Sequence, residues 1–135
     1  MKKYLLTTLE NSKNYTLAVA EAMPEKGYET RPVDSVWNFR ELLSHIGYGI
    51  QWWESNYIKG QKVEWQQPEP KATKKEVLDY LNRCYDGLKQ TIEASAAGDN
   101  IVKGFHTTLD HITHHRGQAV IHLRCNGITP PDYTF

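Results

Sequence analysis

The side chains best suited to chemistry in this sequence are histidines gathered in one short segment. His111 and His115 are four residues apart, so on a helix they lie on the same face, one turn from each other. Two imidazoles in this register can bind one metal ion, as they do in the helix of zinc proteases. Ile112 stands where those proteases carry their catalytic Glu, so the protease base is missing. The alternative is a surface helix face with incidental histidines.

A third ligand has to come from another helix, and His45 is the candidate. It lies between Leu42 and Gly49 at helical spacing, which turns it inward. A single inward histidine is more often a satisfied core residue, but the pair at His111 and His115 shifts that weighting. Three neutral imidazoles with open water positions make a catalytic type of metal site. Imidazole suits zinc, nickel, copper and iron alike, so the ligand type does not choose the ion.

The other histidines are expected to stay outside the metal's ligand set. His114 is one residue from His115, about 100° around the helix axis, and is at most a proton shuttle. His122 follows seven residues after His115 and is expected at the rim or surface. His106 lies near the start of the same helix and is ambiguous.

Three further residues are candidates for supporting the ligands or lining a pocket. Trp53 follows His45 and Gly49 on one helical stripe and is the best candidate for a pocket wall; the other tryptophans are expected in the core or in pocket walls. Arg116 and Gln118 adjoin the histidine pair. Each also has a structural explanation: Arg116 could form an ion pair with a carboxylate, and Gln118 could cap a neighbouring loop.

Helical periodicity in four blocks identifies the elements that must position these residues. Apolar side chains recur at three- and four-residue steps, no β-hairpin signal competes, and the loops are short or moderate, which predicts an all-α four-helix bundle. The expected helices cover about 2–23, about 35–59, 74 to about 95, and a fourth that starts between 103 and 108 and ends near 125. Val36 is expected to be the first buried residue of the apolar stripe on the second helix.

Capping residues and glycines define the ends of these blocks. Asp34 or Ser35 is expected to cap the second helix, and Thr73 the third, with Glu76 in capping-box position. Asn126-Gly127 suits the end of the fourth helix. Two glycines, at 47 and 49, interrupt the second helix, which indicates either close helix packing or space for a ligand.

Length and charge limit the classes of function. The 135 residues are expected to form one domain, 1–135, and 16 basic residues balance 16 acidic ones. Zero net charge argues against a nucleic-acid partner, and no apolar run is long enough for a membrane span. The start of the chain lacks the pattern of a signal peptide. Cys84 and Cys125 are therefore expected to be reduced, in a cytoplasmic protein.

Three segments together resemble the DinB/YfiT-like superfamily. They are the stretch Phe39–Ile46 around His45, the segment His111–Gln118 with its His-His-Arg-Gly-Gln, and the ending Leu123–Tyr133 with Gly-x-x-Pro-Pro. The resemblance covers nearly the whole chain in the right order. It implies a four-helix bundle, often dimeric, with a three-histidine metal site that maps to His45, His111 and His115. Nickel or zinc is the ion it implies.

The resemblance defines the site better than the reaction. Some relatives are S-transferases that use bacillithiol, mycothiol or glutathione, and one branch includes a maleylpyruvate isomerase. The expectation is a metal-dependent enzyme, a homodimer, that transfers a low-molecular-weight thiol to an electrophilic small molecule. Hydrolysis by metal-bound water and non-catalytic metal or ligand binding remain open. No general base is evident, since Glu41 and Asp110 are only neighbours in sequence.

Overall fold

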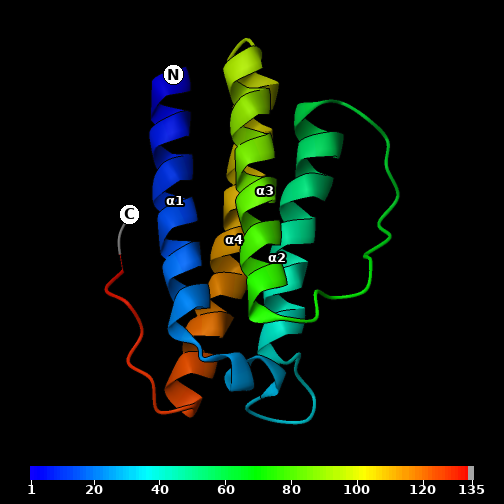
Figure 1. Cartoon of the computed structure of the whole chain (residues 1–135). Helices are drawn as coiled ribbons and strands as arrows, with labels where there is room; N and C mark the ends of the chain where they lie inside the picture. The colour runs from blue at the N-terminus through cyan, green and yellow to red at the C-terminus, as the bar shows by residue number, and fades with distance from the viewer. Residues whose placement is uncertain (134–135) are drawn as a thin grey trace.

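The computed structural model describes residues 1–133 and arranges four helices side by side (Figure 1). The predicted domain also includes residues 134–135, which lie outside the described part. The architecture confirms the expected all-α four-helix bundle. In chain order the elements are α1 (Lys2–Ala22), a 3-10 turn η1 (Glu25–Glu29), α2 (Phe39–Trp53), a π-helical turn η2 (Glu54–Ile58) that extends α2, α3 (Lys74–Ala94) and α4 (Asp99–Cys125).

The helices of the bundle are not all antiparallel to their neighbours along the chain. In Figure 1, α2 and α3 run in the same direction, and α1 and α4 run opposite to them. The chain between α2 and α3 therefore returns along the length of the bundle in a long loop, 59–73 (Figure 1). Helix α4 packs against both α2 and α1, and α3 packs against the same two helices. Consequently α1 and α2 occupy opposite corners, and α4 has one face toward each.

Helix α2 begins later than predicted. Asn38, not Asp34 or Ser35, is its N-cap: the Asn38 side chain accepts from the main-chain N–H of Glu41, and the Glu41 carboxylate accepts from the N–H of Asn38. The residues before it form an exposed linker, in which Val36 is 39% exposed instead of buried as expected. A reciprocal cap satisfies two free amides, which makes Asn38 the stronger start signal.

Helix α4 begins earlier than predicted, at Asp99. Its first turns carry Ile101, Val102 and Phe105, whose three- and four-residue spacing turns them onto the core, and Phe105 is fully buried. This packing extends the helix toward the end of α3. At its other end Gly127 has a φ of +73°, and its N–H donates to the carbonyl of Arg124, as the predicted glycine cap requires.

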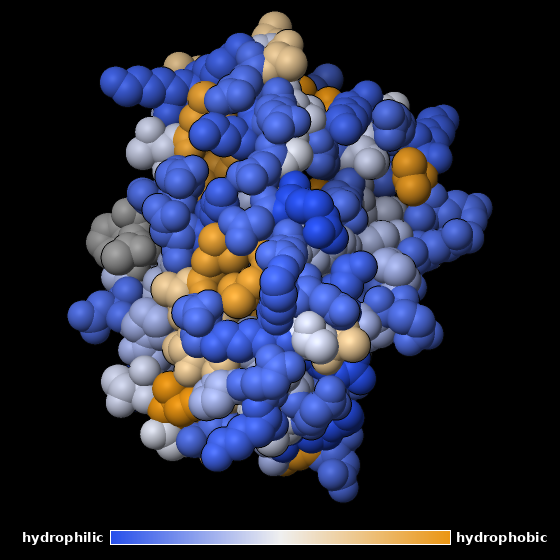
Figure 2. All heavy atoms as spheres, viewed as in Figure 1, coloured by the Kyte–Doolittle hydropathy of each residue, from blue (hydrophilic) through white to orange (hydrophobic). Residues whose placement is uncertain are grey.

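All four helices contribute to one hydrophobic core. Its fully buried members include Leu5, Val19, Leu43, Ile50, Leu81, Leu88, Phe105 and Ile112. The face seen in Figure 2 is mostly hydrophilic, and its apolar side chains are scattered in small patches. Among the residues that the structure describes, no helix is both long and apolar enough to cross a lipid bilayer.

Candidate metal centre

The packing of α2 against α4 brings three histidines together. His45 comes from the buried face of α2 and is only 8% exposed. His111 and His115 come from α4, one turn apart. The Nε2 atom of His45 lies 3.0 Å from Nε2 of His111 and 3.1 Å from Nε2 of His115. One ligand atom from each ring lies within 4.8 Å of the others, so these three side chains could hold a metal ion.

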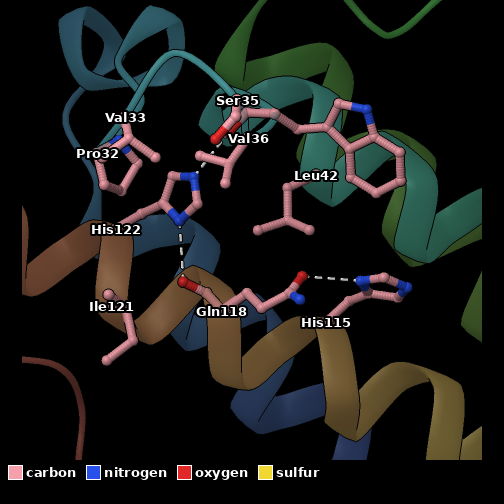
Figure 3. A pocket seen from close by; sticks show the side chains of 10 residues that line it. Pro32, Val33, Ser35, Val36, Leu42, His115, Gln118, Ile121 and His122 are labelled. Atoms are coloured by element: carbon pink, nitrogen blue, oxygen red, sulfur yellow. Dashed lines mark hydrogen bonds between the residues drawn. The ribbon is translucent and has the colours of Figure 1, made fainter.

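Hydrogen bonds on the outer side of two rings direct their lone pairs inward. His45 donates its Nδ1–H to Oε1 of Gln67, at 2.8 Å. His115 donates its Nδ1–H to Oε1 of Gln118, at 2.9 Å (Figure 3). A neutral imidazole carries one N–H, so both Nε2 atoms present lone pairs to each other. Two lone pairs at this distance repel, and a shared cation would turn that repulsion into binding.

Burial keeps the three rings in the neutral form that binds metals. Burial is the largest cause of the lowered pKa of His45 and of His115. The hydrogen bonds to Gln67 and Gln118 act in the opposite direction and raise these pKa values. Burial, followed by the nearby charges of the neighbouring histidines, lowers the pKa of His111 to about 3. Neutral imidazole is the form that binds metal ions, so these three rings could hold an ion at neutral pH.

The sequence model of the DinB superfamily matches residues 8–119. The chain belongs to the DinB superfamily. A crystal structure of a DinB-like protein from Bacillus cereus shares its fold, with a TM-score of 0.80 and 16% sequence identity over 96% of this chain and 95% of that one. None of the curated proteins compared with the sequence matches it. The family resemblance stated from the sequence is thus confirmed, and the solved structure supports the fold.

Aromatic rings enclose the histidines of this DinB protein. Trp53 stacks on His111, with ring centroids 4.6 Å apart and planes 24° from parallel. Trp37 lies 4.5 Å from the ring of His45, and Trp65 lies 5.5 Å from it, both between centroids. These rings restrict access of water to the imidazoles, which strengthens electrostatic interactions at the centre.

Two glycines of α2 make room for side chains of neighbouring helices. A Cβ on Gly49 would lie 2.3 Å from Cε1 of His111, closer than such atoms approach. A Cβ on Gly47 would lie 2.6 Å from the ring of Tyr80 in α3. Close helix packing, one of the two alternatives left open by the sequence, therefore applies to both glycines: Gly47 admits the ring of Tyr80 from α3, and Gly49 admits the imidazole of His111 from α4.

The remaining predicted site residues separate into two groups. Gln118 contacts the centre through His115, and exposed His114 touches the ring of His115, with centroids 4.8 Å apart. Arg116 points toward α1, where its Nη1 donates to the main-chain oxygen of Ser12, and it forms no ion pair with a described carboxylate. Arg116 therefore belongs to a different buried cluster from the histidines.

His122 and His106 lie outside the group of three histidines. His122 is 4% exposed, which corrects its expected place at the rim or surface. Its Nδ1 faces the main-chain oxygen of Gln118 and its Nε2 that of Trp37, both at 2.9 Å, so it ties the linker before α2 to α4. His106 is exposed and lies outside the centre.

Sequence reasoning missed the contacts supplied by the connecting segments. Trp37 belongs to the linker before α2, and Trp65 and Gln67 belong to the loop 59–73. No spacing rule relates these residues to the histidines, because neither segment is periodic. The one available signal was the number of large aromatic side chains in polar segments, where exposure is costly unless a partner covers them.

Proposed function

We propose that this DinB protein binds one divalent metal ion, nickel or zinc, through His45, His111 and His115. The proposal rests on the convergence of three Nε2 atoms, two of which have lone pairs directed at each other. Three protein ligands leave positions for other molecules in the tetrahedral and larger coordination shells of such ions. This donor set fits a catalytic centre better than a closed structural one.

We propose further that the protein transfers a low-molecular-weight thiol to an electrophilic small molecule. A bound metal ion supplies the chemistry by lowering the pKa of a thiol ligand, so that the sulfur is available as thiolate. The chain's own residues orient the site: Gln67 and Gln118 fix the rings of His45 and His115. The tryptophans beside the rings limit water. Thiol chemistry itself is inferred from the family resemblance.

The described residues of the centre offer no carboxylate in position to act as a general base. The side chains grouped there contain no Asp or Glu among the described residues. Asp110 is exposed, and Glu41 is engaged in capping α2. A metal ion lowers the pKa of bound water as it lowers that of a bound thiol, so the preference for thiol transfer over hydrolysis rests on the family resemblance.

The test is a conjugation assay with defined partners. Protein loaded with nickel or zinc is mixed with glutathione, bacillithiol or mycothiol and with 1-chloro-2,4-dinitrobenzene, and the thioether is measured by absorbance and mass spectrometry. We expect metal-dependent turnover that is lost in His111→Ala and kept in His106→Ala, an exposed histidine of the same helix that lies outside the centre. Absence of metal-dependent adduct with every thiol contradicts the transferase. Metal-dependent cleavage of p-nitrophenyl acetate alone identifies a hydrolase.

The same resemblance leads us to propose a homodimer as the functional form. Sedimentation equilibrium of the metal-loaded protein tests this directly. A mass near twice 15.6 kDa is the expected result, and a monomer at all concentrations contradicts it.

A further inference from the structure

A concave apolar pocket adjoins the histidine centre on the side of the linker before α2. It has a volume of about 420 Å³ and lies between that linker, α2 and α4. Figure 3 shows Leu42 from α2 and Gln118 and Ile121 from α4 around it, with Val33 and Val36 of the linker opposite. The volume lies within the range of small-molecule sites, roughly 300–1,000 Å³.

The pocket and the metal centre share a wall. His115 and Gln118 line the pocket, and they are joined by the hydrogen bond that orients His115. Trp37 also lines the pocket, and its ring centroid lies 4.5 Å from that of His45 and 5.9 Å from that of His115. A molecule in the pocket would therefore contact the same side chains that surround the three Nε2 atoms.

The chemistry of the lining selects an uncharged ligand. None of the lining residues is Asp, Glu, Lys or Arg. His122 forms part of the floor, but its two ring nitrogens already face the main-chain oxygens of Gln118 and Trp37. In the metal-free protein an ionised ligand would lose water here without meeting an Asp, Glu, Lys or Arg side chain in the lining, which is unfavourable.

Large apolar side chains are exposed around this one concavity. Val33 is 56% exposed, Ile121 54% and Trp37 44%. Their apolar surface is removed from water when a ligand fills the pocket, which is favourable. The concave shape beside the ligands of the candidate ion favours a small molecule over a flat protein surface.

We propose that this pocket binds a neutral, apolar small molecule. We identify that molecule as the electrophile that receives the thiol, and this second step rests on the proposed function. The specificity of the enzyme would then be for uncharged, apolar electrophiles, and Ile121 and Val36 at the pocket would set it. Binding itself requires no metal ion, so it can be examined separately from the reaction.

The experiment uses two fluorescent probes with one scaffold and different charge. N-phenyl-1-naphthylamine is neutral, and 1-anilinonaphthalene-8-sulfonate carries a sulfonate. We expect the neutral probe to bind at one site per chain, before and after dialysis against EDTA, and the anionic probe to bind at least about tenfold more weakly, which corresponds to about 1.4 kcal/mol. Equal or tighter binding of the sulfonate contradicts the selection of neutral ligands.

Two variants locate the binding site. Ile121→Glu places a charge beside the pocket on an exposed helix position and should weaken the neutral probe at least about tenfold. Val63→Glu is the matched control, because Val63 is 44% exposed and does not line the pocket. Thermal unfolding checks that both variants fold. Unchanged binding in Ile121→Glu, or no binding to the wild type, overturns the proposal. Conversion of a dimer to monomer by Ile121→Glu also overturns it, by identifying the pocket as a subunit contact.

The two proposals fail in different ways. Probe binding that depends on Ile121, without thiol transfer by the metal-loaded protein, leaves the pocket and removes the reaction. If wild type and Ile121→Glu transfer a thiol to a neutral aromatic electrophile with the same KM, the transferase proposal stands and the pocket is not its substrate site.

Discussion

Helix α4 carries two buried polar clusters on neighbouring faces, and they are built in opposite ways. Toward α2 it presents the two histidines of the candidate metal centre. Toward α1 it presents Arg116, which is 4% exposed. The Nη1 group of Arg116 lies within hydrogen-bond distance of Ser12 and Thr16, and its guanidinium lies over the ring of Tyr15, 4.8 Å from the centroid.

The difference is in what each cluster leaves unpaired. Around Arg116 the chain provides its own partners, because the hydroxyl of Tyr85 joins those of Ser12 and Thr16. At the histidine centre, Nδ1 of His111 and Nε1 of Trp53 are buried without a hydrogen-bond partner, and no other buried side-chain nitrogen or oxygen of residues 1–133 is in that state. Buried groups left unpaired are costly in a purely structural cluster. The arginine cluster is satisfied by the chain's own groups, which fits support of the fold, whereas the proposal of metal binding at the histidine cluster rests on its converging Nε2 atoms.

The largest expected effect is loss of the metal ion from a variant that still folds. Truncating His111→Ala removes one of three ligands, and we expect near-stoichiometric metal in the wild type to fall to background. Elemental analysis of purified protein measures this, with His114→Ala as the exposed control. Equal metal content in wild type and His111→Ala would remove the distinction between the clusters.

The opposite result is expected for the arginine cluster. Arg116→Ala removes one donor from the main-chain oxygen of Ser12 and from the hydroxyls of Ser12 and Thr16, which keep only Tyr85 as a partner, and it opens a cavity. The free energy of unfolding should therefore fall by on the order of 3 kcal/mol. Urea denaturation of metal-free protein measures it. Exposed Arg124→Ala on the same helix should stay within about 0.5 kcal/mol of wild type. A stable Arg116→Ala that loses metal instead would reverse the assignment.

A smaller effect is expected from filling the space that α2 reserves for a ligand. Gly49→Ala forces the ring of His111 to move and should weaken metal binding by roughly 10–100-fold, the range seen when the surroundings of ligands are disturbed. Competition with a chromogenic chelator measures the affinity. Gly117→Ala is the control, because its Cβ would meet no atom within 4 Å and alanine favours a helix by about 1 kcal/mol. Unaltered affinity in Gly49→Ala would show that the ring position is not tightly set.

A separate effect concerns the pH dependence of stability in the metal-free protein. The pKa of His111 is lowered from 6.5 to about 3, so below pH 6.5 the unfolded chain binds a proton that the folded ring resists. The free energy of unfolding should therefore fall as the pH falls from 6.5 toward 3, and no such loss should occur above 6.5. Urea denaturation of wild type and His111→Ala across this window tests it, since the other groups are common to both. Parallel curves would contradict the effect of His111.

The sequence contained the helices and the three histidines because both depend on local regularities. A four-residue step places His111 and His115 on one face of any helix, and apolar periodicity turns His45 inward. The predicted start of α2 was wrong because Val36 was taken as part of the apolar stripe of the helix. In the structure the cap at Asn38 begins the helix, and Val36 lies before it. The predicted start of α4 was too late, because the prediction was centred on the histidine segment and the first apolar residues of the helix lie before it.

Only the tertiary structure decided how the two helices meet and what surrounds the histidines. The distance between His45 and His111 depends on the packing of α2 on α4, which Gly49 permits. Trp37, Trp65 and Gln67 reach the centre from a linker and a crossover loop, whose paths follow from the parallel course of α2 and α3. Such segments carry no periodic pattern, so their contacts arise from the closing of the bundle and cannot be obtained from spacing alone.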